Sequence, residues 1–127
     1  MQEKQIVMTE GAPVPSGPYS QAVIANGFVF VAGQRPQDPK TGALAEGIAA
    51  QTRQCLQNVK AILEAAGSSM AHIVNTHVYL SDISHFAAMN EIYRELVPAP
   101  YPTRTTIAAQ LRGILVEIEV IAVLPAL

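Results

Sequence analysis

The chain has 127 residues, of which 50% are hydrophobic and 14% are charged, and its formal net charge is −2. A chain of this length is expected to form one domain, residues 1–127, that buries a sizeable core. The eight Lys and Arg residues are scattered, which argues against a surface for nucleic acid or for an anionic membrane. The apolar content is high for a small monomer, so we expect part of the surface to be covered in an oligomer.

The cysteine content and the hydrophobic runs indicate the cellular compartment of the protein. Cys55 is the only cysteine, which excludes an intramolecular disulfide and is consistent with a reducing cytosol. Residues 1–4 are not followed by a hydrophobic segment, and no apolar run approaches the length that spans a membrane. We therefore expect a soluble, cytoplasmic protein.

Turn residues and apolar periodicity divide the chain into strands and helices. Gly17-Pro18 fixes a turn before the second strand, and Asn26-Gly27 between two apolar runs is a strong signal for a two-residue hairpin. Gly67 is placed to end the first helix. We predict strands at residues 4–8, 19–25, 28–32, 73–80, 103–109 and 115–123, and helices at 46–66 and from 81–84 to Pro98.

The order of these elements, β-β-β-α-β-α-β-β, predicts an α+β fold. We expect a two-layer sandwich in which a mixed six-stranded sheet carries two helices on one face. The other face of the sheet would be bare, and a trimer or another closed oligomer would cover it. Cys55 falls within the apolar stripe of the first helix, so we interpret it as a core residue and not as a nucleophile.

The last strand has two different faces. Its even-numbered residues from Ile114 to Leu124 are apolar, whereas the odd-numbered positions begin with Glu117 and Glu119 and end with two aliphatic residues. A solvated face would stay polar along its length, so part of this face is expected to be covered. Arg104 offers a planar fork suited to a carboxylate, and Glu117 is expected on the neighbouring strand, in the same covered space. A ligand site and a structural ion pair at a subunit interface are equally supported.

Three other positions have both a structural and a functional interpretation. Tyr19 is interpreted first as a core residue with a satisfied hydroxyl. Gly33 lets the backbone approach a ligand or a partner closely, or it marks a bulge or a strand end. Asn90 is a polar residue on the apolar stripe of the second helix, so its amide is either satisfied inside the fold or reaches a ligand.

Common catalytic motifs are missing from the sequence. His72, His77 and His85 are not spaced to share one helix face, and no Cys or carboxylate cluster joins them, so we predict no metal site. The sequence has no glycine-rich phosphate loop, no G-x-S-x-G serine motif and no dinucleotide fingerprint. Any chemistry must therefore use an anion anchor, an acid and water.

Seven short motifs, taken together, resemble one family. They are GPYSQA at 17–22, VAGQ at 31–34, DPKTG at 38–42, QNVKAIL at 57–63, NEIY at 90–93, PTR at 102–104 and VEIE at 116–119. In this order they resemble the Rid family of reactive intermediate (imine/enamine) deaminases, also called YjgF-like or L-PSP proteins. The resemblance covers nearly the whole chain, and its motifs are specific jointly, not singly.

The resemblance implies a chorismate-mutase-like fold and a homotrimer with a ligand site in each cleft between subunits. It also implies hydrolysis of 2-aminoacrylate-like imines, released by pyridoxal-phosphate enzymes, to 2-keto acids and ammonia. Carried over by position, Arg104 would grip the substrate carboxylate, and Glu117 would orient or protonate the attacking water and the leaving nitrogen. Tyr19 would close the pocket, Gly33 would lend backbone and Asn90 would support the wall. This chemistry needs no cofactor, because an imine hydrolyses readily once it is bound beside a held water and a proton carrier.

The sequence departs from the family pattern around these residues. Ala32 stands where deaminating members often have Ser, and Thr106 stands where many have Cys; both belong by position to the substrate-binding set. The hairpin over 106–117 is shorter than in the best-known members. Arg35 puts a second cation where an aliphatic residue is common. This arginine either favours a more acidic ligand or is simply solvated, and solvation is the preferred interpretation.

Functions of other classes stay open. A binding module would hold a 2-keto acid or another small carboxylate as a signal, and the absent Ser and Cys would then mark lost catalysis. A ribonuclease or translation inhibitor is a label that family members sometimes carry. It is disfavoured by the near-neutral charge and by the lack of a pair of basic side chains that could catalyse RNA cleavage. A chaperone-like role also stays open.

Overall fold

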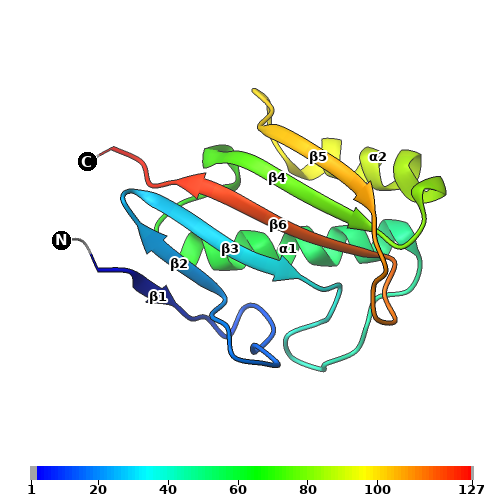
Figure 1. Cartoon of the computed structure of the whole chain (residues 1–127), viewed down its shortest axis with the longest axis horizontal. Helices are drawn as coiled ribbons and strands as arrows, with labels where there is room; N and C mark the ends of the chain where they lie inside the picture. The colour runs from blue at the N-terminus through cyan, green and yellow to red at the C-terminus, as the bar shows by residue number, and fades with distance from the viewer. Residues whose placement is uncertain (1–2, 127) are drawn as a thin grey trace.

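The computed structural model describes residues 3–126, and its six strands form one mixed sheet in the order β1-β2-β3-β6-β4-β5 (Figure 1). Only the pair β4 and β5 is parallel, and the other neighbours are antiparallel. The strands are β1 Gln5–Val7, β2 Ala22–Ala25, β3 Phe28–Gln34, β4 Ile73–Leu80, β5 Thr103–Ala108 and β6 Val116–Val123, and the helices are α1 Ile48–Ala65 and α2 Phe86–Leu96. The predicted α+β order and the six-stranded sheet are confirmed.

The turn between β2 and β3 has the predicted form, because Asn26 and Gly27 both have positive φ, at 52° and 80°. The strand before it is shorter than predicted and begins at Ala22. The preceding residues are held as a loop by Gln21, whose side-chain amide accepts from the Thr9 N–H and donates to the carbonyls of Thr9, Ala12 and Pro13. This buried glutamine fixes the loop that carries Tyr19.

Both helices cover the same face of the sheet, as Figure 1 shows from the opposite side. The stripe of α1 that contains Cys55 is buried, so the core interpretation of this cysteine is confirmed. Gly67, with φ of 88°, follows the helix end as predicted. The second helix is preceded by a 3-10 turn, Ile83–His85, in which Asp82 accepts from the Ser84 N–H, and the α-helix itself begins at Phe86.

The other face of the sheet is uncovered in the single chain, as predicted. Phe28 and Phe30 of β3 lie on it, 41% and 44% exposed, with their ring centroids 6.2 Å apart. His77 and Tyr79 of β4 are stacked on the same face, and the Tyr79 hydroxyl donates to the Glu119 carboxylate. Aromatic rings and a bonded carboxylate thus occupy a surface that the chain itself does not bury.

The expected adjacency of the strands carrying Arg104 and Glu117 is wrong. β4 lies between β5 and β6, and it pairs Thr76 with Arg104 but Tyr79 with Glu117. Thr76 is buried beneath the helices, whereas Tyr79, three residues further along, points to the open face. Arg104 therefore faces the helices, and Glu117 faces the uncovered side of the sheet.

Candidate active site

The guanidinium of Arg104 is held in one orientation by α2. Its Nη1 donates to Oδ1 of Asn90 at 2.8 Å, and its Cζ lies 4.6 Å from the ring centroid of Tyr93 and 5.5 Å from that of Phe86. No carboxylate among residues 3–126 lies within ion-pair distance of Arg104. The amide oxygen of Asn90 therefore has the arginine as its hydrogen-bond donor. The remaining N–H donors of the arginine are suited to an added anion.

Thr106 lies two residues beyond Arg104 on the same face of β5 and is paired with buried Val78. Its Oγ1 is buried and has no hydrogen-bond partner within residues 3–126. A buried unpartnered hydroxyl is uncommon, because it loses its water without a replacement. We call the residues Asn90, Tyr93, Arg104 and Thr106 the anchor half of the site.

Glu117 and Gly33 meet at a bulge where β3 passes β6. The register between these strands shifts between Val31 and Gln34, so Ala32 and Gly33 form the irregular segment. A Cβ placed on Gly33 would lie 3.1 Å from the carboxyl carbon of Glu117, closer than ordinary contact. The missing side chain of Gly33 therefore makes room for the Glu117 carboxylate, which accepts no hydrogen bond within the described residues.

Tyr19 is not a core residue, so the first interpretation of it is wrong. The residue is 49% exposed, and its hydroxyl accepts from the Ser16 N–H at 3.2 Å. The ring lines the same pocket as Gly33 and Glu117, because the Gln21 loop holds it beside the bulge of β3. Its burial was predicted from an apolar strand that begins only after it.

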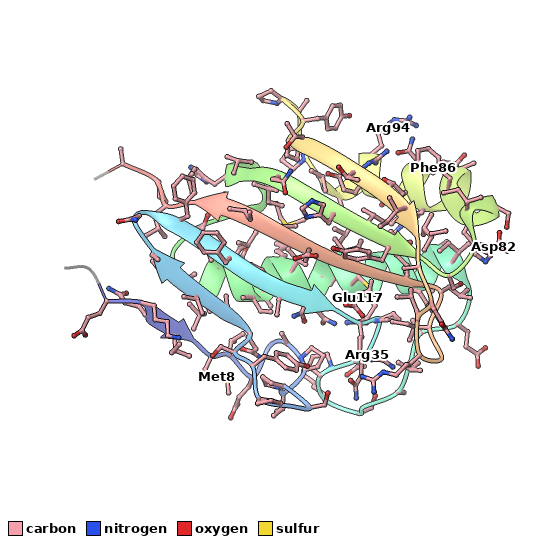
Figure 2. The ribbon with its side chains drawn as sticks, in the orientation of Figure 1. Met8, Arg35, Asp82, Phe86, Arg94 and Glu117 are labelled. Atoms are coloured by element: carbon pink, nitrogen blue, oxygen red, sulfur yellow. The ribbon has the colours of Figure 1, made fainter. Side chains whose placement is uncertain are left out.

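Two arginines complete this pocket, and one of them was missed in the sequence. Nη1 of Arg35 donates to the backbone carbonyl of Arg112 at 3.2 Å, and both side chains line the pocket that contains Tyr19 and Glu117. Figure 2 shows Arg35 beside Glu117, near the end of β3 and the start of β6. Arg112 comes before Gly113 in the loop that joins β5 to β6 across β4, where the sequence pattern indicated only a tight turn between neighbouring strands. We call Tyr19, Gly33, Arg35, Arg112 and Glu117 the acid half.

Burial and charge act together on titratable groups beneath and beside the acid half. Burial raises the pKa of the Cys55 thiol, the charge of Glu117 raises it further, and Arg35 opposes this rise. The hydrogen bond to Glu119 is the largest cause that raises the pKa of Tyr79 to about 12, followed by burial and by the charges of Glu119 and Glu117. The thiol and the phenol therefore stay protonated at neutral pH and are not bases for the site.

The anchor half and the acid half do not share a pocket in the described chain. Asn90 and Arg104 line a hollow beside α2, and Tyr19 and Glu117 line a hollow beside the β3 bulge. In Figure 2, Phe86 and Arg94 mark α2 behind β5, away from Arg35 and Glu117. A single chain thus presents two parts of a site on different faces of its sheet.

Within residues 3–126, no three His, Cys, Asp or Glu side chains gather in a way that would hold a metal ion. Over the same range, neither helix has the length and apolar character needed to cross a membrane.

The fold and these side chains define a small α+β protein that carries an arginine anchor and a separate carboxylate. The model of the endoribonuclease L-PSP family matches residues 9–124. The chain is 49% identical over 122 residues to a RutC family protein of Pyrococcus horikoshii, covering 94% of this chain and 97% of the relative. It is 45% identical over 122 residues to a 2-iminobutanoate/2-iminopropanoate deaminase of Salmonella typhimurium, covering 92% and 95%.

Solved structures give the same assignment. The crystal structure of Escherichia coli TdcF with bound serine superposes with a TM-score of 0.90 at 39% identity, covering 94% of this chain and 98% of TdcF. The chain belongs to the L-PSP family, the same family as the Rid and YjgF-like proteins that its motifs resemble. This family includes deaminases of reactive intermediates.

Proposed function

We propose that the protein hydrolyses small 2-imino acids, or their enamine tautomers, to 2-keto acids and ammonia without a cofactor. The observation that carries this proposal is the guanidinium of Arg104, fixed by Asn90 and Tyr93 and without a carboxylate partner in the described chain. Such a group suits the carboxylate that every 2-imino acid carries. The deaminase of Salmonella typhimurium, with 45% identity, supports the same reaction class.

The proposed reaction divides the work between the two halves. Arg104 holds the substrate carboxylate, which places the C=N carbon near Glu117. Glu117 takes a proton from water as the water oxygen bonds to this carbon and the C=N π electrons move to the nitrogen, and Glu117 then gives this proton to the nitrogen. The resulting carbinolamine loses ammonia as the C–N bond breaks and the keto group forms, with Glu117 moving the proton. Tyr19 closes the pocket, and Ala32, Gly33 and Thr106 line it.

We propose that the halves meet across an interface between copies of this chain. Arg104 and Glu117 face opposite sides of one sheet, so one copy would supply the anchor half and its neighbour the acid half. The uncovered sheet face supports association, because the aromatic rings of Phe28 and Phe30 are exposed on it. A repeated contact of two different surfaces closes into a ring, and a homotrimer is the ring we propose. A chorismate-mutase-like arrangement is part of this proposal.

The first test is a coupled assay. A pyridoxal-phosphate dehydratase acts on serine or threonine, and release of 2-keto acid is followed with and without this protein. Wild type should accelerate release, and Arg104→Ala should lower the acceleration by about 10³-fold, because several charge-assisted hydrogen bonds are lost. Arg53→Ala is the matched control, since Arg53 bonds Glu95 on the helix surface. An Arg104→Ala variant as fast as wild type would overturn the role of the anchor.

A mixing experiment tests the interface. Arg104→Ala chains and Glu117→Ala chains are each expected to be inactive. Reassembled together at equal amounts, they should regain about a quarter of wild-type activity, because in a cyclic ring that fraction of interfaces joins two intact halves. Sedimentation of the mixture checks the oligomer. Failure of mixed oligomers to regain activity would mean that both halves act within one chain.

A regulatory module that binds small carboxylates is the second candidate. The TdcF structure with bound serine supports it, since that relative holds a carboxylate ligand. Its signature would be thermal stabilisation by 2-keto acids in wild type but not in Arg104→Ala, together with no acceleration of imine hydrolysis across a panel of amino acids.

A further inference from the structure

The acid half contains more positive charge than the proposed reaction needs. Arg35, Arg112 and Glu117 are the charged side chains that line its pocket among the described residues, so two guanidiniums face one carboxylate. The 2-imino acid carboxylate is already matched by Arg104 in the other half. The pair of arginines therefore has no role in holding a substrate whose side chain is neutral.

Arg35 is not simply solvated, in contrast to the interpretation preferred from sequence. It is half-buried, comes after the bulge that positions Gly33, and donates to the Arg112 carbonyl at 3.2 Å. This bond joins the end of β3 to the loop between β5 and β6, and it holds the Arg35 side chain at the pocket that Arg112 also lines. The same loop brings Arg112 to the wall of the site.

Neither arginine is neutralised by an ion pair. Within residues 3–126 the ion pair is Arg53 with Glu95, and neither Arg35 nor Arg112 lies within that distance of a carboxylate, Glu117 included. A closed cleft would remove water from these cations, which is costly unless an anion accompanies them. A substrate that brings a second carboxylate supplies this anion.

We infer that the site selects 2-imino acids with a carboxylate on the side chain, which Arg35 and Arg112 receive while Arg104 holds the first carboxylate. This inference rests on the proposed function for the reaction, and it names the substrate class of the same site. The simplest members are 2-iminosuccinate and 2-iminoglutarate. Their hydrolysis gives dicarboxylic 2-keto acids and ammonia, with the same balance of water and protons as for neutral imines.

The main alternative within the molecule is Arg94. This residue lines the hollow of the anchor half with Arg104 and Tyr101, so it would hold a second carboxylate on the other side of the cleft. Its side chain is exposed, as is that of Arg112, but the acid half also has Arg35, which is half-buried and bonded at the pocket wall. The variant Arg94→Gln distinguishes this arrangement from the one proposed.

Binding is measured first, independently of turnover. The probes are 2-oxoglutarate and 2-oxopentanoate, which have the same chain length and differ in the terminal carboxylate. Wild type should bind 2-oxoglutarate more tightly by about tenfold or more, and Arg35→Gln or Arg112→Gln should remove most of this preference, because hydrogen bonds to a charged group are lost. Lys40→Gln, a cation in an exposed turn outside the pocket, should keep it. Equal binding of the two acids, or a preference removed only by Arg94→Gln, would overturn the inference.

Turnover is measured with imines made in place. D-aspartate oxidase supplies 2-iminosuccinate, and D-amino-acid oxidase acting on D-alanine supplies 2-iminopropanoate. We expect the ratio of kcat/KM for the first over the second to fall about tenfold or more in Arg35→Gln. Acceleration of the neutral imine with no preference for 2-iminosuccinate would overturn the inference and leave the proposed function standing. Preferred binding of 2-oxoglutarate without hydrolysis of either imine would refute the proposed function and support the second-carboxylate site.

Discussion

The two halves of the candidate site differ in how firmly their charged groups are held. In the anchor half, Arg104 is bonded to Asn90 and stacked on Tyr93, so its direction is set before any ligand arrives. In the acid half, Glu117 has no hydrogen-bond partner in the described chain, and Tyr19 is 49% exposed. The anchoring guanidinium is thus held in place by the chain, whereas the carboxylate is not held by a hydrogen bond.

This difference indicates different tasks. A group that binds a carboxylate does so more tightly when it is preorganised, because binding then loses no conformational entropy in ordering that group. A group that exchanges protons must reach both water and the leaving nitrogen, which a carboxylate locked by hydrogen bonds does less well. The variants below test this division, starting with the largest expected effect.

Glu117→Gln removes the proton carrier and keeps the shape of the side chain. We expect kcat to fall by about 10²- to 10⁴-fold, the usual contribution of a positioned general acid or base, with a small change in KM. Glu119→Gln is the matched control, since this carboxylate lies two residues away on the same face and bonds Tyr79. Equal losses in both variants would show that the effect comes from the sheet and not from the site.

Gly33→Ala tests the room that the bulge leaves for Glu117. The added methyl would meet the Glu117 carboxylate, which is the end of a flexible side chain, so the carboxylate should move while the fold persists. We expect kcat to fall by about 10²-fold, as misplacement by about 1 Å can cause. Circular dichroism and urea unfolding check that the fold persists, and both should match wild type because the group displaced is the end of a side chain. Unchanged activity would mean that Glu117 need not lie over the bulge.

Thr106→Val tests whether the buried hydroxyl of the anchor half is reserved for a ligand. Val has nearly the same shape and no polar atom, so the free energy of unfolding without ligand should rise by about 1 kcal/mol. The KM should rise by about fivefold, as for one lost hydrogen bond. Thr105→Val, on the open face of the same strand, is the comparison for urea unfolding. A less stable Thr106→Val variant would show that the hydroxyl has a structural partner.

Tyr79→Phe is expected to have the smallest effect, because Tyr79 lies on the sheet between the halves. The pKa of Tyr79 is raised from 10.0 to about 12, chiefly by its hydrogen bond to Glu119. The folded state therefore keeps the Tyr79 proton to a higher pH than the unfolded state, which stabilises the fold. This stabilisation is complete below pH 10 and is lost as the pH rises toward 12. Melting temperatures between pH 9 and 12 should fall less steeply for Tyr79→Phe than for wild type. Tyr101→Phe, an exposed tyrosine, should melt like wild type.

Much of the secondary structure follows from the sequence because local physics decides it. Asn26 and Gly27 tolerate the positive φ values that their hairpin requires, and the alternation from Ile114 onward places Glu117 opposite the buried face of β6. The apolar stripe around Cys55 marks the buried side of α1. The family resemblance, carried by short motifs, also identified Arg104 and Glu117 as the charged groups of interest.

The tertiary structure alone decided which side of the sheet each of these two groups faces. Strand pairing joins residues far apart in the chain, and no local pattern states that β4 separates β5 from β6 or which residue of β4 pairs with Arg104. Because side chains alternate along a strand, that register turns Arg104 toward the helices and Glu117 toward the open face. The contact of Arg35 with Arg112, 77 residues apart, likewise depends on where the loop between β5 and β6 lies in the folded chain. The sequence thus singled out Arg104 and Glu117 as candidate groups, because their residue types and motifs are local, and the packing of the sheet alone decided that they are presented in two separate halves.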